Sequence, residues 1–114
     1  MATRVLIDDL RHFDNPMPDD IILRTSTDAL EWLRSNTEPV SELWLDHDLG
    51  GDDTIGVVID ELSFQAFTNS LATELYDLII VHTSNPAGAA MMLTALNRWG
   101  YKVLRVNASN YFFC

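Results

Sequence analysis

Aspartates that can bind a metal ion or act as nucleophiles gather at two places in this sequence. Asp8 and Asp9 follow a short apolar run near the N-terminus, and Asp46 and Asp48 follow a second run near the middle of the chain. Two carboxylates about 4 Å apart repel each other by roughly 4 kcal/mol at an effective dielectric constant near 20. If these groups meet in space, they need solvent, protonation or a bound cation. A set of oxygen ligands without cysteine favours Mg²⁺ or Mn²⁺ over zinc.

Acids at strand ends also have a structural interpretation, because they cap helices and face water. For Asp8, Asp9 and Asp46 together we favour metal binding, since perturbed acid clusters concentrate at functional sites. Of these, Asp46 is the best candidate nucleophile. Asp52 and Asp53 we interpret as loop acids beside a helix start.

A third polar group follows the apolar run at residues 78–81. His82 is a candidate general acid or base, since its ordinary pKa suits proton transfer near neutral pH. Alone it is equally a histidine satisfied within the strand end. Asp48 binds the metal through water or supports His82. Ser84 and Asn85, with the start of the next helix, predict a phosphate-binding cradle, although a plain helix cap fits the same residues.

Arg11 and His47 complete the candidate site. Arg11 is the best candidate phosphate clamp, because its planar guanidinium matches phosphate oxygens. Its alternative role is a surface ion pair with Asp9 or Asp14. His47 lies between two of the aspartates, and in a continuing strand it points to the opposite face. It either orients a carboxylate or packs beneath a helix, and the pattern favours neither.

Short apolar runs predict the strands that position these groups. They are rich in β-branched residues and mostly not alternating, as expected for strands covered on both faces, and they lie at residues 5–7, 21–23, 43–45, 78–81 and 103–104. Stretches with helical spacing separate them, at residues 29–33, from 55 to Tyr76 with a break near 69–70, and at 86–99. The last helix has a cap at Asn85, proline at its first position and Gly100 after its last turn. This alternation predicts a parallel α/β sheet, whose sites lie beyond the carboxyl ends of the strands.

Two segments depart from that alternation. Residues 10–20 contain two prolines and little helical periodicity, so the first crossover is predicted to be a loop. The tail after Val106 is too short for a regular helix. Its aromatic residues Tyr111, Phe112 and Phe113 are expected to cover an under-protected sheet face or to join a partner, including a second copy of the chain.

Length and charge narrow the function classes. The 114 residues, 47% of them hydrophobic, fit one domain spanning 1–114. With 17 acidic against 7 basic residues, the net charge is −10, which argues against extended DNA binding and against anionic membranes. A phosphate-bearing substrate stays possible, because a bound cation inverts the local field. A single cysteine and no membrane-spanning run lead us to expect a cytoplasmic protein.

Three blocks carry a family resemblance. They read Asp-Asp-Leu-Arg at 8–11, Leu-Asp-His-Asp-Leu-Gly at 45–50 and His-Thr-Ser-Asn-Pro at 82–86. In this order and spacing, over roughly residues 4–106, they resemble the cyclic-phosphate processing receiver domain, an atypical relative of the receiver domains of response regulators. Members are common in bacteria and their phages, so the compartment would be the bacterial cytoplasm.

The resemblance implies a flavodoxin-like, receiver-like α/β fold with a five-stranded parallel sheet of order 2-1-3-4-5, a loop as first crossover and a truncated last helix. It also implies Mg²⁺ at the acidic residues and a role in opening or removing cyclic phosphates on nucleotides or RNA ends. Where ordinary receivers have a Lys-Pro pair, this chain has Arg105-Val106. That departure, with the reduced helices, argues against conventional two-component signalling.

Three functions therefore remain for testing. The first is a Mg²⁺-dependent phosphoesterase acting on a cyclic phosphate. The second is a phosphoacceptor protein in which Asp46 is phosphorylated and Thr83 or Ser84 responds. The third is a non-catalytic binding protein, such as a phage-encoded modulator of a host partner.

Overall fold

Five parallel strands form the central sheet of the computed structural model, which describes residues 3–106 and 112–113. The strands are β1 (Arg4–Ile7), β3 (Ile21–Leu23), β4 (Glu42–Leu45), β5 (Ile79–Val81) and β6 (Val103–Arg105). They lie in the order β3-β1-β4-β5-β6. Counted along the chain, this is the predicted order 2-1-3-4-5, and the receiver-like α/β fold is confirmed.

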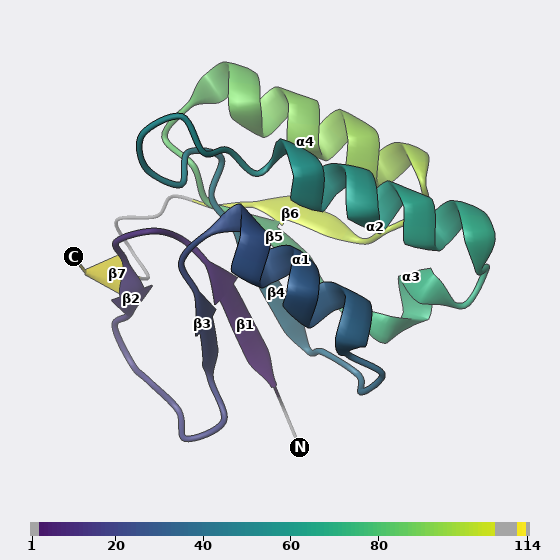
Figure 1. The fold of residues 1–114 in the computed structure, drawn as a ribbon, viewed down its shortest axis with the longest axis horizontal. Coiled ribbons are helices and arrows are strands. Elements are labelled where there is room, and N and C mark those ends of the chain that lie inside the picture. Colours follow the sequence, from purple (N-terminus) through teal and green to yellow (C-terminus); the bar gives the residue numbers. More distant parts are fainter. Residues whose placement is uncertain (1–2, 107–111, 114) are drawn as a thin grey trace.

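Helices cover one face of this sheet (Figure 1). They are α1 (Ser26–Ser35), α2 (Gly56–Thr68), the short α3 (Ala72–Leu75) and α4 (Pro86–Arg98). The main core lies between them and the sheet, and it takes alternate residues of the central strands together with buried side chains of the long helices, among them Val5, Ile7, Leu43, Leu45, Ala29, Leu62 and Met92. The predicted break after α2 is present, and Asn85 caps α4 by accepting a hydrogen bond from the backbone N–H of Gly88 at 3.0 Å.

The opposite face of the sheet has no helix among the described residues. Instead, Phe13 of the two-residue strand β2 (His12–Phe13) packs on it beside Leu6, Trp44 and Ile80, all buried. The rings of Phe13 and Trp44 meet edge to face, with centroids 5.6 Å apart. Coverage ends at the outer strands, where Ile22 and Leu104 are exposed. The expectation of strands covered on both faces was therefore wrong for β3 and β6, because the first crossover is a loop rather than a helix and no described helix lies over β6 on this face.

Charged groups hold that loop against the sheet. The guanidinium of Arg4 donates to both carboxylate oxygens of Asp20, at 2.9 and 2.7 Å, and lies 3.9 Å from the centre of the Phe13 ring. Arg24 donates to the backbone carbonyl oxygens of Asp8 and Arg11 at 3.1 and 2.6 Å. These contacts fasten the loop to the sheet in place of helical hydrogen bonds.

The C-terminal tail returns to this loop. Strand β7 (Phe112–Phe113) pairs antiparallel with β2 in a separate two-stranded sheet (Figure 1). Tyr111, the third aromatic residue of the tail, lies outside the described residues. None of the described helices combines the length and the apolar character that crossing a membrane requires.

Packing of Phe13 is predicted to supply much of the stabilisation that a helix would otherwise give on this face of the sheet. We expect Phe13→Ala to lower the free energy of unfolding by about 3–5 kcal/mol, as for other buried phenylalanines. Phe67→Ala is the matched control, because that ring is 72% exposed and contacts only the edge of Trp99 among the described aromatic rings; it should cost about 1 kcal/mol. Urea denaturation measures both values. Equal losses would show that Phe13 does not hold the loop to the sheet.

Candidate metal centre

The register of β1 and β4 places two aspartates side by side. Ile7 pairs with Leu45, so Asp8 and Asp46 follow at the same level of neighbouring strands. The Asp46 backbone N–H donates to the carbonyl of Ile7 at 3.1 Å, which extends the ladder to the acid itself. With Asp9, these residues offer one carboxylate oxygen each within 4.8 Å of one another. We call Asp8, Asp9 and Asp46 the acidic triad.

Asp8 is held rigidly. Its side chain is buried, and Oδ1 accepts hydrogen bonds from the backbone N–H groups of Leu10 and Arg11, both at 2.9 Å. Oδ2 faces Nη1 of Arg11 at 3.5 Å and Nδ1 of His82 at 3.7 Å. The local turn that follows β1 therefore fixes one oxygen and leaves the other directed into the site.

Asp46 is held by the residue that follows it and by the segment after β5. Its Oδ1 accepts from the backbone N–H of His47 at 2.8 Å, and its carboxylate is hydrogen-bonded by the side chain of Thr83 at the end of β5. Burial, and secondly the charge of Asp8, raises the pKa of Asp46 above its usual value. The charged form is thus disfavoured in the folded protein, and a cation would relieve that penalty.

Asp9 depends on a glycine from the loop after β4. Gly50 has a φ of +92°, and a Cβ added there would lie 3.1 Å from Oδ2 of Asp9. The absence of a side chain at Gly50 therefore leaves room for the third carboxylate. The position of Gly50 directly after the Leu-Asp-His-Asp-Leu block is the sequence signal for this role.

Arg11 faces Asp8 and Asp46 rather than its alternative surface partners Asp9 and Asp14. Its Nη1 lies 3.5 Å from Oδ2 of Asp8 and 3.8 Å from Oδ2 of Asp46, and its side chain is 25% exposed. A phosphate bound by Arg11 would therefore lie beside the triad. Its role as a phosphate clamp stays a prediction.

His82 lies behind the triad. It is fully buried, and its ring centroid is 6.0 Å from that of Trp44. Burial, opposed by the charge of Asp8, lowers the pKa of His82 to about 4, so the ring is neutral at pH 7. The structure brings His82 to Asp8 but not to the surface, and its general acid–base role stays a prediction.

Asp48 lies outside the acidic triad. Its side chain is 65% exposed, and Oδ1 lies 3.1 Å from Nδ1 of His47. Asp48 adds no oxygen to the triad, and its predicted roles in binding the metal through water or supporting His82 stay predictions. His47 packs beneath α4, where a Cβ added to Gly88 would approach its Cγ to 2.5 Å, and Nδ2 of Asn85 is 3.5 Å from its Nδ1. Both roles considered for His47 have a counterpart in the structure, since the ring packs under α4 and its Nδ1 also contacts the carboxylate of Asp48.

Some of the other predicted residues cap helices, and others lie at the edge of the site. Asn85 is a helix cap, whereas Ser84 is exposed. Asp53 accepts hydrogen bonds from the backbone N–H and the hydroxyl of Ser26 at the start of α1, and the hydroxyl bond is the main cause that lowers the pKa of Asp53. The capping role for Asp53 is thus observed, although the helix it caps is not the adjacent one. Thr83, which orients Asp46, was absent from our predicted phosphate and metal ligands.

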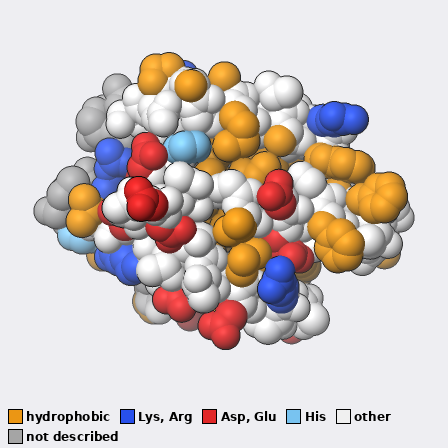
Figure 2. All heavy atoms as spheres, turned by 45° about the horizontal axis from the view of Figure 1, so that its top comes forward, with side chains coloured by type: hydrophobic (Ala, Val, Ile, Leu, Met, Phe, Trp, Pro, Cys, Tyr) orange, Lys and Arg blue, Asp and Glu red, His pale blue; other side chains and the backbone are white. Residues whose placement is uncertain are grey.

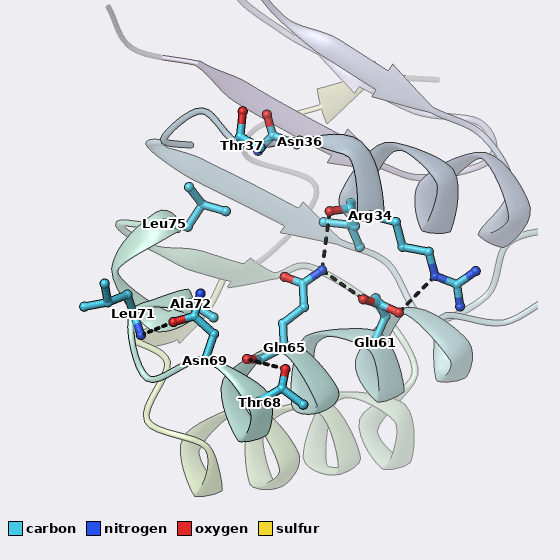
Figure 3. Close-up of a pocket in the computed structure, with 11 residues that line it drawn as sticks. Arg34, Asn36, Thr37, Glu61, Gln65, Thr68, Asn69, Leu71, Ala72 and Leu75 are labelled. Atoms are coloured by element: carbon cyan, nitrogen blue, oxygen red, sulfur yellow. Dashed lines mark hydrogen bonds and ion pairs between the residues drawn. The ribbon is translucent and has the colours of Figure 1, made fainter.

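On the face shown in Figure 2, hydrophobic side chains gather at one end, whereas acidic side chains lie toward the other end and across the middle. A cavity of about 500 Å³ lies away from the triad, between the ends of α1 and α2 and helix α3 (Figure 3). Its polar groups bond mainly to one another: Gln65 donates to Glu61 at 3.0 Å, and Glu61 accepts from Arg34 at 3.1 Å. This cavity contains no described residue of the triad, so we do not assign the chemistry to it.

Comparison with known families agrees with the site. A family model described as "Cyclic-phosphate processing Receiver domain" matches residues 3–98. This range contains the triad, Arg11 and His82. No curated protein and no solved structure matches the chain.

The role of Gly50 can be separated from the cost of its backbone conformation. Gly50→Ala and Gly51→Ala both place alanine at positive φ, at +92° and +55°, and each should lose about 1–2 kcal/mol of stability. Only Gly50→Ala also crowds Asp9, since nothing lies within 4 Å of a Cβ at Gly51. We expect Mg²⁺ affinity, measured by calorimetric titration, to fall about 10–100-fold in Gly50→Ala alone. Equal affinities in the two variants would contradict this role.

Asp46 is predicted to destabilise the metal-free protein at neutral pH. Its pKa is raised by folding, so the folded state binds more protons than the unfolded state between the two pKa values, and the contribution of Asp46 to stability falls as the pH rises through that interval. In EDTA at pH 7, Asp46→Asn should therefore unfold at a higher temperature than the wild type. The difference should vanish in acid. Added Mg²⁺ should stabilise the wild type only; a variant less stable than the wild type in EDTA at pH 7 would refute the prediction.

Proposed function

This chain belongs to the cyclic-phosphate processing receiver family, and on that premise we propose that it is a Mg²⁺-dependent phosphoesterase that opens a cyclic phosphate on a nucleotide or an RNA end. The observation that supports this most is the acidic triad, with one oxygen of each carboxylate within 4.8 Å of the others. Such a set of oxygen ligands suits Mg²⁺ or Mn²⁺. The adjacent guanidinium of Arg11 suits the phosphate.

The proposed reaction is a hydrolysis. A water oxygen bonds to phosphorus, one of the two ester P–O bonds of the ring breaks, and the released oxygen takes up a proton. The product is a phosphate monoester beside a free hydroxyl group. A divalent cation at the triad would stabilise charge on the phosphoryl oxygens and lower the pKa of a bound water.

The residues of the chain supply the positioning. Backbone N–H groups after β1 and β4 fix Asp8 and Asp46 before any ligand binds, so little reorganisation accompanies the reaction. Arg11 holds a phosphoryl oxygen next to them. His82 stays the predicted acid–base group; it is buried, and its Nδ1 lies 3.7 Å from Oδ2 of Asp8.

Activity is tested on a panel of 2′,3′-cyclic nucleotides and RNA oligomers ending in a 2′,3′-cyclic phosphate. We expect Mg²⁺-dependent formation of the monoester, and a loss of about 100-fold or more in Asp46→Asn. Asp52→Asn is the control, because Asp52 is an exposed loop acid outside the triad. The proposal fails if no substrate turns over with Mg²⁺, or if Asp46→Asn matches the wild type.

A phosphoacceptor role is the second candidate, supported by the hydrogen bond between Thr83 and the carboxylate of Asp46. In that case a small phosphodonor with Mg²⁺ adds one phosphoryl group to Asp46, detectable by mass spectrometry and removed by hydroxylamine. A non-catalytic binding protein, the third candidate, would instead keep its biological activity in Asp46→Asn and lose it when the aromatic tail is deleted.

A further inference from the structure

A second place for an anion lies at the same edge of the sheet, beside the acidic triad. A cavity of about 380 Å³ is lined by Thr83, Ser84, Arg105 and Val106, at the carboxyl ends of β5 and β6. We propose that this cavity binds a second phosphate of the substrate, so that the preferred substrate carries two phosphates rather than a cyclic phosphate alone. This inference rests on the proposed function, which it refines.

Arg105 is the group that makes the cavity suitable for an anion. It is exposed, and within residues 3–106 and 112–113 no carboxylate forms an ion pair with it. Other arginines of this acid-rich chain do have such partners: Arg4 pairs with Asp20, and Arg34 with Glu61. Among the described residues, no carboxylate therefore competes with a ligand for the guanidinium of Arg105, and its planar fork matches phosphate oxygens.

Thr83 lies between the acidic triad and the cavity, and it contacts both. Its hydroxyl bonds to Asp46 of the triad and accepts from the backbone N–H of Asn85 at 3.2 Å, while the residue also lines the cavity. The neighbouring Ser84 is exposed at the cavity and offers a hydroxyl donor. A ligand at the triad thus borders directly on the cavity.

Strand order separates the two arginines of the site. Arg11 follows β1 and reaches Asp46 after β4, whereas Arg105 ends β6, beyond β5. The backbones of β4 and β6 are two strand spacings, roughly 10 Å, apart. One phosphate at the triad is therefore expected to contact Arg11, and a second group of the same ligand is expected to contact Arg105.

Two kinds of ligand carry phosphates on both sides of a nucleoside. One is a free nucleotide with phosphates at its 3′ and 5′ positions, and the other is an RNA end, in which the 5′ phosphate is a phosphodiester. Their shared chemistry is what the cavity would recognise. Ligands that resemble the product allow this to be measured as binding, without any dependence on turnover.

The test is calorimetric titration of the protein, in buffer that contains Mg²⁺, with three ligands. These are adenosine 3′-monophosphate, adenosine 3′,5′-bisphosphate and a dinucleotide ending in a 3′-phosphate. The wild type should bind the two-phosphate ligands at least about 10-fold more tightly than the monophosphate, the effect of one charge-assisted contact. Arg105→Gln should abolish that preference without changing monophosphate binding. Arg98→Gln is the control, because this exposed arginine lies in the last turn of α4.

The outcomes separate the two proposals. If the wild type shows no preference for a second phosphate, or if Arg105→Gln and Arg98→Gln behave alike, the second phosphate site is refuted, whether or not cyclic phosphates turn over. If the preference depends on Arg105 but no cyclic substrate turns over, the site stands and the phosphoesterase proposal fails. Tighter binding of the dinucleotide than of the bisphosphate would assign the site to RNA ends, and the reverse order would assign it to free nucleotides.

Discussion

The repulsion between two neighbouring carboxylates governs much of this structure. The pairing of β1 with β4 forces Asp8 and Asp46 together in a largely buried place, where like charges raise the free energy of the fold. Backbone N–H groups, the guanidinium of Arg11 and the hydroxyl of Thr83 partly offset this repulsion. Tolerating such strain at one place is typical of sites that bind a cation, because a more stable arrangement would no longer attract one.

The two faces of the sheet around that site are covered in different ways. One face of the sheet has a complete helical layer, whereas the other relies on Phe13, Trp44 and the loop held by Arg4. The same loop begins with Asp8, Asp9 and Arg11, so the segment that covers the sheet also supplies most of the charged groups of the site. Packing of Phe13 and placement of the triad are consequently coupled within one stretch of chain.

Local patterns predicted the parts of this structure that depend on neighbouring residues. Apolar runs gave the strands, and Asn85 with Pro86 gave the start of α4, because capping and strand formation are decided within a few residues. Contacts between distant segments could not be read in this way: Asp53 caps α1 from the loop after β4, Gly50 makes room for Asp9, and His82 is buried behind Asp8. Their partners depend on strand order, which the residues alone left open and the family resemblance supplied.

The bond from Asp53 to the start of α1 has an evolutionary consequence. The loop after β4 is fastened at Asp46 by the sheet and at Asp53 by α1, and it passes Asp9 between these points. An insertion there would disturb the acidic triad and a helix cap at once. Residues 14–19, by contrast, are exposed in the first crossover, and loops of this kind accept changes in length. Related chains with new specificities are therefore expected to have lengthened the first crossover, while the loop after β4 keeps its length.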